Sequence, residues 1–280
     1  MKRILITGAN SYIGTSFEKW LRKDSDKYIV DTIDMIGDDW RKKSFAGYDA
    51  ILHVAGIVHQ KKEHKIKDLY YKVNRDLAYE TAKKAKEAGV KHFVFLSSMS
   101  VYGIEEGVID ETTPVRPKSA YGKSKAEAEE LIGGLEDEFF TVSIIRPPMV
   151  YGKGCKGNYP RLARLALGVP IFPEMDNKRS MIYIDNLSEF VKLLIDNGSG
   201  GLFCPQNAEY VNTCEMVKLI SKAHGKNIIM TKLFNPFLKL INASVLNKVF
   251  GDLVYDMRMS RYMANYIVCN FGESIKKTEG

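Results

Sequence analysis

The eleven residues ILITGANSYIG, Ile4 to Gly14, decide the fold. The run that ends at Thr7 has no polar alternation, which is typical of a strand buried on both faces of a parallel sheet. Gly8 permits a tight turn, and Gly14 permits a helix to pack closely on the strand. The first turn of that helix offers free backbone N–H groups to a phosphate, so the stretch predicts a dinucleotide site.

The spacing is a variant of the Rossmann fingerprint in which Ser11 stands in place of the middle glycine. The small Ser11 side chain fits there, and its hydroxyl could donate a hydrogen bond to a phosphate. A plain strand-to-helix turn without a ligand is the alternative interpretation. The residues of this turn assigned to the cofactor are Gly8, Asn10, Ser11, Tyr12, Ile13 and Gly14.

An acidic residue follows the second predicted strand, residues 28–33. Asp34 lies 20 residues beyond Gly14 (34 − 14 = 20), where a carboxylate can accept both ribose hydroxyls and repel a 2′-phosphate. This predicts NAD rather than NADP. Asp31 is the competing candidate, but it is expected inside the strand.

Strand and helix patterns alternate through the first half of the chain. Further strands are predicted at 50–54, 92–96 and 141–145, and helices at 66–88, closed by Gly89, and at 121–131. This rhythm predicts an α/β fold with a doubly wound parallel sheet of the Rossmann type.

Beyond residue 150 the predicted elements shorten and the pattern loosens. Helices are expected near 159–167, 185–196 and 212–224, with no internal repeat or low-complexity linker. We therefore predict a nucleotide-binding domain at 1–150 and a smaller C-terminal substrate lobe at 151–280, packed as one interleaved unit. The apolar segment 233–250 is expected to cover the substrate cleft or pack on the core; a membrane-surface or dimer helix is the alternative.

The composition of the 280 residues excludes several classes. No apolar run reaches about 18 residues, so no membrane span is expected. Met1 leads directly into the first strand, so no signal peptide is expected. The four cysteines lack metal-ligand spacing, so they predict reduced thiols in a cytoplasmic protein and no metal site.

The formal charge is +7, and the basic residues are spread along the chain. Nucleic-acid binding is therefore not expected, and the mixed cluster 59–67 is interpreted as a solvated loop and helix start. A mild positive field suits a small, doubly phosphorylated substrate.

A tyrosine and a lysine four residues apart form the candidate catalytic pair. Tyr121 and Lys125 share a helix face in YGKSK, where an ammonium would lower the pKa of the phenol and suit it to acid–base chemistry. Tyr79 and Lys83 have the same spacing but lie inside a long predicted helix. Tyr121 instead follows a strand that ends in SSMS (97–100), so Tyr121–Lys125 is preferred and Tyr79–Lys83 is predicted to be a solvated helix face.

Seven motifs together resemble one family. They are TGANSYIG (7–14), HVAG (53–56), VN (73–74), SSMSVYG (97–103), YGKSK (121–125), RPPMVYG (146–152) and RSMIYIDNL (179–187). In this order they resemble the extended short-chain dehydrogenases, above all the nucleotide-sugar 4-epimerases of the UDP-galactose/UDP-glucose type. The resemblance covers residues 1 to about 195 well and the C-terminal third poorly.

The resemblance implies roles for individual residues. Ser98 would hydrogen-bond the 4-oxygen of the sugar, Tyr121 would take the C4 hydroxyl proton as hydride leaves to the nicotinamide, and Lys125 would bind the nicotinamide ribose. Further implied contacts with the cofactor are Val54, Ala55, Gly56, Asn74 and Pro148. Implied contacts with the substrate are Ser98, Ser100, Tyr121, Met149, Asn158 and Arg179.

The family would act on a UDP-sugar by inverting C4 through a 4-keto intermediate, with NAD as cofactor. Arg179 would clamp the diphosphate, with a surface ion pair as the alternative; for Asn158 a helix N-cap is the alternative. A second diphosphate arginine has no clear match, and Arg258 and Arg261 are candidates. The segment 38–40 is a candidate for adenine contacts. A homodimer would pair the helices near 66–88 and 121–133 by analogy.

Two rivals use the same scaffold differently. A nucleotide-4-keto-sugar reductase would use Ser98, Tyr121 and Lys125 but release its oxidised cofactor at each turnover. A 4,6-dehydratase is disfavoured because Met99 and Ser100 replace the Asp-Glu pair of that branch. A non-catalytic NAD-binding protein is the alternative from another class, and the retained catalytic residues argue against it.

Overall fold

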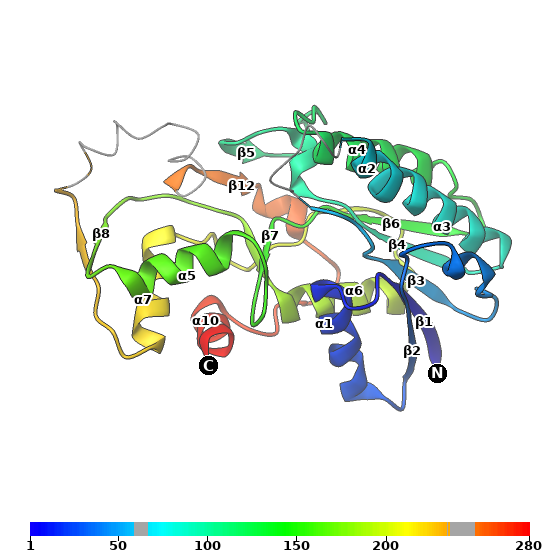
Figure 1. Ribbon diagram of the computed structural model, residues 1–280, viewed down its shortest axis with the longest axis horizontal. Coiled ribbons are helices and arrows are strands. Elements are labelled where there is room, and N and C mark those ends of the chain that lie inside the picture. Colours follow the sequence, from blue (N-terminus) through cyan, green and yellow to red (C-terminus); the bar gives the residue numbers. More distant parts are fainter. Residues whose placement is uncertain (59–66, 234, 236–249) are drawn as a thin grey trace. The chain divides into compact units, whose positions relative to one another are not determined.

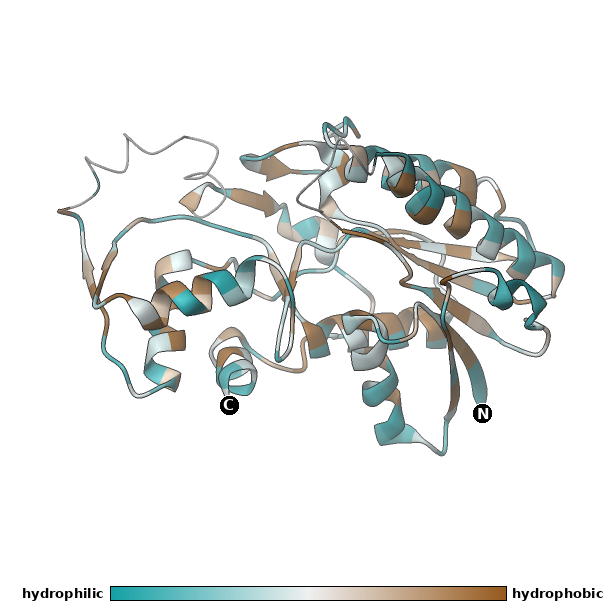
Figure 2. Ribbon diagram, in the orientation of Figure 1, coloured by the Kyte–Doolittle hydropathy of each residue, from teal (hydrophilic) through white to brown (hydrophobic). Residues whose placement is uncertain are grey.

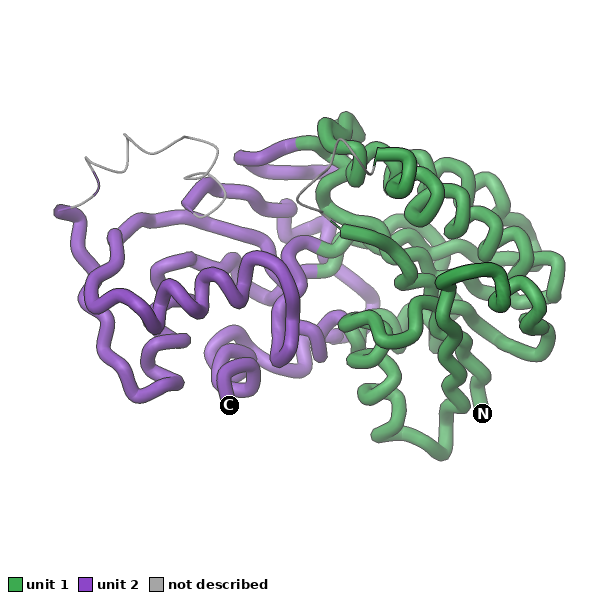
Figure 3. The backbone as a smooth tube through the Cα atoms, viewed as in Figure 1, with its two compact units in different colours: residues 1–103, 114–147, 188–205 green, residues 104–113, 148–187, 206–280 purple. Residues whose placement is uncertain are grey.

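The computed structural model describes residues 1–58, 67–233, 235 and 250–280. These residues form two compact units, shown in green and purple in Figure 3. The first comprises 1–103, 114–147 and 188–205, and the second comprises 104–113, 148–187 and 206–280. Most of the predicted 59–67 cluster and of the apolar segment 233–250 lies outside the described residues.

A six-stranded sheet, parallel throughout, is the frame of the first unit (Figure 1). Its strands are β1 (Lys2–Thr7), β2 (Tyr28–Ile33), β3 (Ala50–His53), β4 (His92–Leu96), β6 (Thr141–Ile145) and β10 (Gly201–Phe203). Their order is β10-β6-β4-β3-β1-β2. The predicted α/β fold with a Rossmann-type parallel sheet is confirmed.

Helices cover both faces of this sheet (Figure 1). One face carries α2 (Lys67–Tyr70), α3 (Leu77–Glu87) and α4 (Ala120–Gly133), and the other carries α1 (Tyr12–Leu21) and most of α6 (Ile184–Asn197). The strands are apolar along most of their length because both faces are covered (Figure 2). A doubly wound sheet results.

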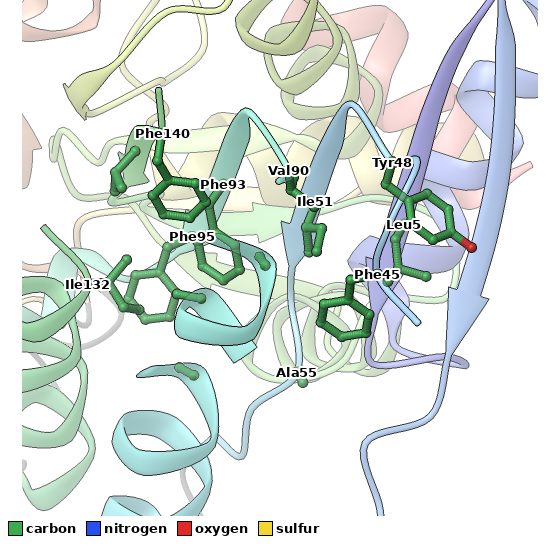
Figure 4. Packing of buried hydrophobic residues seen from close by; sticks show 14 of the residues in the cluster. Leu5, Phe45, Tyr48, Ile51, Ala55, Val90, Phe93, Phe95, Ile132 and Phe140 are labelled. Atoms are coloured by element: carbon green, nitrogen blue, oxygen red, sulfur yellow. The ribbon is translucent and has the colours of Figure 1, made fainter. Parts of the chain in front are cut away.

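The hydrophobic core beneath α3 and α4 explains this arrangement (Figure 4). Leu5, Ile51 and Phe93, from three neighbouring strands, pack there on the small residues of α3 and on Ile132 of α4. Trp40 joins the same cluster and is 2% exposed. It is therefore a core residue, whereas Asp38 and Asp39 of the same segment are exposed, so adenine contacts from this segment stay a prediction.

The sheet reverses its direction of growth between β1 and β3. The chain passes from β1 to β2 on one side and then crosses to β3 on the other. In open α/β sheets, ligands bind beyond the carboxyl ends of the strands at this point. The glycine turn that follows β1 lies there.

The predicted helix at 66–88 is interrupted. A π-helical turn, Tyr71–Asp76, separates α2 from α3, and residue 66 lies outside the described residues. The wider turn directs Asn74 inward, where its side chain is fully buried and hydrogen-bonded. The helix ends as predicted, because Gly89 follows α3 in the left-handed conformation, with φ +77°.

The second unit contains short elements, as expected for the C-terminal part. Its strands pair in parallel as β5 (Gly107–Ile109) with β12 (Leu253–Tyr255), β7 (Met149–Tyr151) with β9 (Met181–Tyr183), and β8 (Ile171–Pro173) with β11 (Ile229–Thr231). Its helices include α5 (Asn158–Gly168), α7 (Thr213–Ala223) and α10 (Phe271–Glu279).

The division into units cuts across α6, whose residues from Ser188 onward belong to the first unit, while 104–113 belong to the second.

The four cysteines are buried free thiols. Within the described part of the chain, no helix combines the length and apolar character required to cross a membrane.

Candidate active site

The structure brings Ser98, Tyr121 and Lys125 together in the first unit. Ser98 follows β4 and caps the 3-10 turn Met99–Tyr102. Tyr121 is the second residue of α4, and Lys125 lies one turn further along the same face. Ser119 caps this helix by accepting a hydrogen bond from the Gly122 N–H at 3.0 Å.

Hydrogen bonds orient the three side chains. Ser98 hydrogen-bonds Tyr121, and its Oγ also accepts from the Ser100 N–H at 3.1 Å. Lys125 Nζ donates to the Leu96 carbonyl at 2.8 Å and lies 4.6 Å from the centroid of the Phe95 ring. The geometry therefore places the predicted acid–base group beside its hydroxyl partner at the carboxyl end of β4.

Burial dominates the electrostatics of the pair. Tyr121 is 6% and Lys125 5% exposed. Desolvation raises the pKa of Tyr121, with the hydrogen bond from Ser98 acting in the opposite direction. Desolvation lowers the pKa of Lys125 to about 8, while the negative charge of Glu129 acts in the opposite direction. The structure thus differs from the expectation of a lowered tyrosine pKa, because burial of the phenol outweighs the effects of its neighbours.

The alternative pair is a surface feature. Tyr79 lies on α3, and Lys83 is exposed and ion-paired with Glu87 at 3.9 Å. This agrees with the prediction of a solvated helix face.

Asn74 anchors the chain that follows β3. Its Oδ1 accepts from the Ile57 N–H at 2.9 Å, and its Nδ2 donates to the Ile57 carbonyl at 3.1 Å and to Ser124 Oγ at 3.2 Å. A Cβ on Gly56 would lie 3.1 Å from Asn74 Oδ1 and 3.5 Å from Lys125 Nζ. The predicted cofactor residues 54–56 and Asn74 are therefore assembled next to Lys125.

The turn after β1 fits a dinucleotide such as NAD. Gly8 has φ +88°, and a Cβ there would come within 2.9 Å of the Ala55 backbone. A Cβ on Gly14 would lie 2.7 Å from Ser11 Oγ and 3.2 Å from a Val54 methyl group. The two glycines allow the turn, α1 and the end of β3 to approach each other closely.

The backbone of this turn directs its donors. The Gly8 and Ala9 N–H groups donate to the Ile33 carbonyl. Ser11 caps α1, its Oγ accepting from the Gly14 N–H at 3.1 Å. The N–H groups at the start of α1, Tyr12 and Ile13, are therefore the donors positioned for a phosphate.

The two aspartates of the second strand have different surroundings. Asp31 lies within β2, accepts from Tyr48 Oη at 2.6 Å and faces Arg3 at 3.6 Å. Asp34 follows the strand, is exposed, and accepts from the Ile36 N–H at 3.0 Å. The geometry favours Asp34 as the ribose-binding carboxylate.

The remaining predicted residues belong to the second unit. Met149 begins β7, directly after Pro148. Asn158 is the first residue of α5, and Gly157 occupies the N-cap position, so the N-cap alternative for Asn158 is wrong. The Arg179 guanidinium donates to the Gly251 carbonyl at 2.8 Å, and desolvation lowers its pKa. The roles of these residues stay predictions.

The second-arginine candidates also differ. Arg258 is exposed, and its guanidinium donates two hydrogen bonds to Asp256, at 3.0 and 2.8 Å. Arg261 lines a cavity of about 470 Å³ within the second unit. A role of either arginine in diphosphate binding stays a prediction.

Four residues near the site were missed by sequence reasoning. Glu129 and Arg146 form a buried ion pair, and Thr7 Oγ1 hydrogen-bonds His53 Nδ1 at 2.8 Å between the last residues of β1 and β3. Desolvation lowers the pKa of His53 to about 3, which keeps it neutral. The sequence could have pointed to Glu129, because it follows Lys125 by four residues and therefore shares its face of α4.

Comparison with known proteins identifies the chain at family level. The profile of the NAD dependent epimerase/dehydratase family matches residues 4–203. The chain belongs to this family. Membership confirms the resemblance to the extended short-chain dehydrogenases of the nucleotide-sugar epimerase type, an NAD-dependent class of enzymes.

Two relatives of known name and one solved structure illustrate what the chain is similar to. The chain is 33% identical to "UDP-glucose 4-epimerase" of Vibrio cholerae, over 91% of this chain and 88% of that protein. It is 30% identical to "N-acetyl-alpha-D-glucosaminyl-diphospho-ditrans,octacis-undecaprenol 4-epimerase" of Escherichia coli O157:H7, over 93% and 85%. A dTDP-4-dehydrorhamnose reductase from Clostridium acetobutylicum shares the fold, with a TM-score of 0.75 and 21% identity over 99% and 98% of the two chains.

Proposed function

We propose that this protein inverts the configuration at C4 of a UDP-sugar through a 4-keto intermediate. The observation that carries the proposal is the buried Tyr121–Lys125 pair, with Ser98 hydrogen-bonded to Tyr121, in the unit that contains the glycine turn. The 33% identity to the Vibrio cholerae epimerase supports the choice of reaction. The second unit, with Met149, Asn158 and Arg179, is proposed to hold the substrate.

Different residues of the first unit are proposed to bind different parts of the cofactor. The N–H groups that begin α1 would hold the pyrophosphate, Asp34 the adenosine ribose, and Lys125 the nicotinamide ribose. Lys125 Nζ uses one of its protons on the Leu96 carbonyl, which leaves donors for ribose hydroxyls. Bound NAD⁺ would supply the acceptor, and NADH the donor, for the hydride at C4.

Tyr121 is the proposed acid–base group that transfers the proton. Cationic Lys125 and the positive charge of bound NAD⁺ would favour the phenolate that burial disfavours. As the C4–H bond breaks, the Tyr121 oxygen would take the proton of the C4 hydroxyl, and a ketone would remain at C4. After the sugar rotates, Tyr121 returns the proton to the 4-oxygen. Ser98 donates a hydrogen bond to that oxygen, and its own orientation is set by the Ser100 N–H. Burial of Tyr121 excludes water from the transfer.

The test follows C4 inversion by NMR. UDP-glucose, UDP-galactose and their N-acetylated forms are incubated with the purified protein, and any nucleotide released on denaturation is identified. We expect inversion of at least one sugar, and a loss of turnover on the order of 10²-fold or more in Tyr121→Phe.

Tyr79→Phe is the matched control, because Tyr79 also precedes a lysine by four residues but lies on the surface face of α3. It should retain full turnover. Equal activity of wild type and Tyr121→Phe would refute the proposal. Absence of inversion, with oxidised cofactor released when a 4-keto sugar is supplied, would identify a reductase instead.

The same test also varies the diphosphate group to which the sugar is attached. The Escherichia coli relative has a name that specifies an undecaprenyl diphosphate in place of a nucleotide. An N-acetylhexosamine on a polyprenyl diphosphate is therefore assayed beside the UDP-sugars. Inversion of the lipid-linked sugar alone would retain the chemistry and replace the proposed substrate.

A further inference from the structure

A buried ion pair, Glu129–Arg146, lies one helical turn beyond Lys125 on α4. Arg146 Nη2 and Glu129 Oε2 are 2.5 Å apart, and the Arg146 Nε contacts both carboxylate oxygens at 3.0 and 3.1 Å. The two side chains are 10% and 7% exposed. Ser97 Oγ also donates to the carboxylate, so Glu129 is held in one orientation.

The pair joins three segments of the first unit. Glu129 lies on the face of α4 that carries Tyr121 and Lys125, because the three are spaced by four residues. Ser97 is the neighbour of Ser98 at the end of β4. The contact of Glu129 with Ser97 thus connects the tyrosine helix to the hydroxyl that faces it.

Arg146 provides the third segment, the end of β6. Its guanidinium also donates to Tyr102 Oη at 2.8 Å and lies 4.9 Å from the centre of that ring. Next to Arg146, the Pro147 carbonyl accepts from the Met99 N–H at 3.1 Å. The segments that carry the catalytic residues therefore meet at one carboxylate and one guanidinium.

The same carboxylate is the anion that acts on Lys125. The groups packed around Lys125 are Tyr121 and Glu129 from α4, His53 from β3, Asn74 from the π-helical turn, and Phe95 with the Leu96 carbonyl from β4. The tyrosine and asparagine are uncharged at neutral pH, and desolvation keeps His53 neutral. Among these neighbours Glu129 supplies the negative charge that offsets the desolvation of Lys125.

We propose that Glu129, fixed by Arg146 and Ser97, is a positioning residue that keeps Lys125 cationic at neutral pH and aligns α4 with the end of β4. The value of this arrangement for catalysis rests on the proposed function. A neutral Lys125 would no longer favour the tyrosine phenolate, and turnover would fall.

The test titrates Lys125 itself. Protein labelled with ¹³C at lysine Cε is followed by NMR across pH with no sugar present. We expect one lysine signal with a midpoint near 8, far below the ordinary 10.5, and its loss in Lys125→Met. In Glu129→Gln that midpoint should fall by about one pH unit, and Glu129→Asp, which keeps the charge, should largely restore it.

Glu130→Gln is the matched control, because Glu130 is exposed one position further along α4 and its loss changes the net charge equally. Its titration should equal that of wild type. If Glu129→Gln does not fold, because Arg146 is left buried without its partner, the double variant Glu129→Gln/Arg146→Met removes both charges. Because the loss of the Arg146 cation partly offsets the loss of the carboxylate, the Lys125 midpoint should lie below that of wild type but fall less than in Glu129→Gln.

An unchanged Lys125 midpoint in a folded variant without Glu129, or a wild-type midpoint near 10.5, would overturn the inference. The titration requires no turnover, so a failure of sugar epimerisation leaves it intact. Where turnover is measurable, the alkaline limb of its pH profile should move down by the same amount in Glu129→Gln.

Discussion

Lys125→Met should abolish turnover yet stabilise the fold at neutral pH. The pKa of Lys125 is lowered from 10.5 to about 8, a difference of 10.5 − 8 = 2.5, and each pKa unit corresponds to about 1.36 kcal/mol. Keeping the buried lysine protonated therefore costs about 3 kcal/mol of unfolding free energy below pH 8. Methionine fills a similar volume and carries no charge.

The sign follows from proton binding. Between the folded pKa and the unfolded pKa, the unfolded chain holds a proton that the folded chain has released. Stability of the wild type therefore gains from a rise in pH through this window. The cost falls from about 3 kcal/mol at pH 7 to roughly 1.4 kcal/mol at about pH 9.5, and vanishes above the unfolded value.

Urea unfolding of wild type and variant at these two pH values measures the effect. The difference between them should shrink by about 2 kcal/mol from pH 7 to about pH 9.5, whatever constant is added by lost contacts with Leu96 and Phe95. Lys123→Met, at an exposed position on the same helix, should show no such pH dependence. A difference for Lys125→Met that does not change with pH would refute the reasoning.

Four other variants test the site. Gly14→Ala adds a Cβ only 2.7 Å from a serine oxygen in the turn, so NAD affinity measured by calorimetry should fall about tenfold or more. Asp34→Asn removes the carboxylate that would repel a 2′-phosphate, so the ratio of NADP to NAD affinity should rise in the same assay. Asn74→Ala leaves two backbone groups without their partner and should lower the unfolding free energy by about 1–3 kcal/mol in urea. Arg146→Ala leaves Glu129 as an uncompensated buried charge and should lower the unfolding free energy by about 3–5 kcal/mol in urea. An unchanged unfolding free energy would show that the pair does not stabilise the fold.

The sequence by itself determined the local parts of this protein. The predicted strands at 28–33, 92–96 and 141–145 coincide with β2, β4 and β6 residue for residue. For β4 and β6 the reason is that strands inside a sheet covered on both faces need largely apolar side chains. The glycine turn and the Tyr121–Lys125 pair were also visible, because close backbone approach and helix-face spacing depend on residues a few positions apart.

The tertiary structure decided which polar groups are buried and with which partners. The π-helical turn around Asn74, the place of Trp40 in the core and the Glu129–Arg146 pair all depend on segments brought together by the sheet. Even the pKa of Tyr121 reverses the expectation, because desolvation depends on the whole environment of the phenol. Spacing along a chain predicts a shared helix face, whereas burial and the pairing of charges are set by contacts between distant segments.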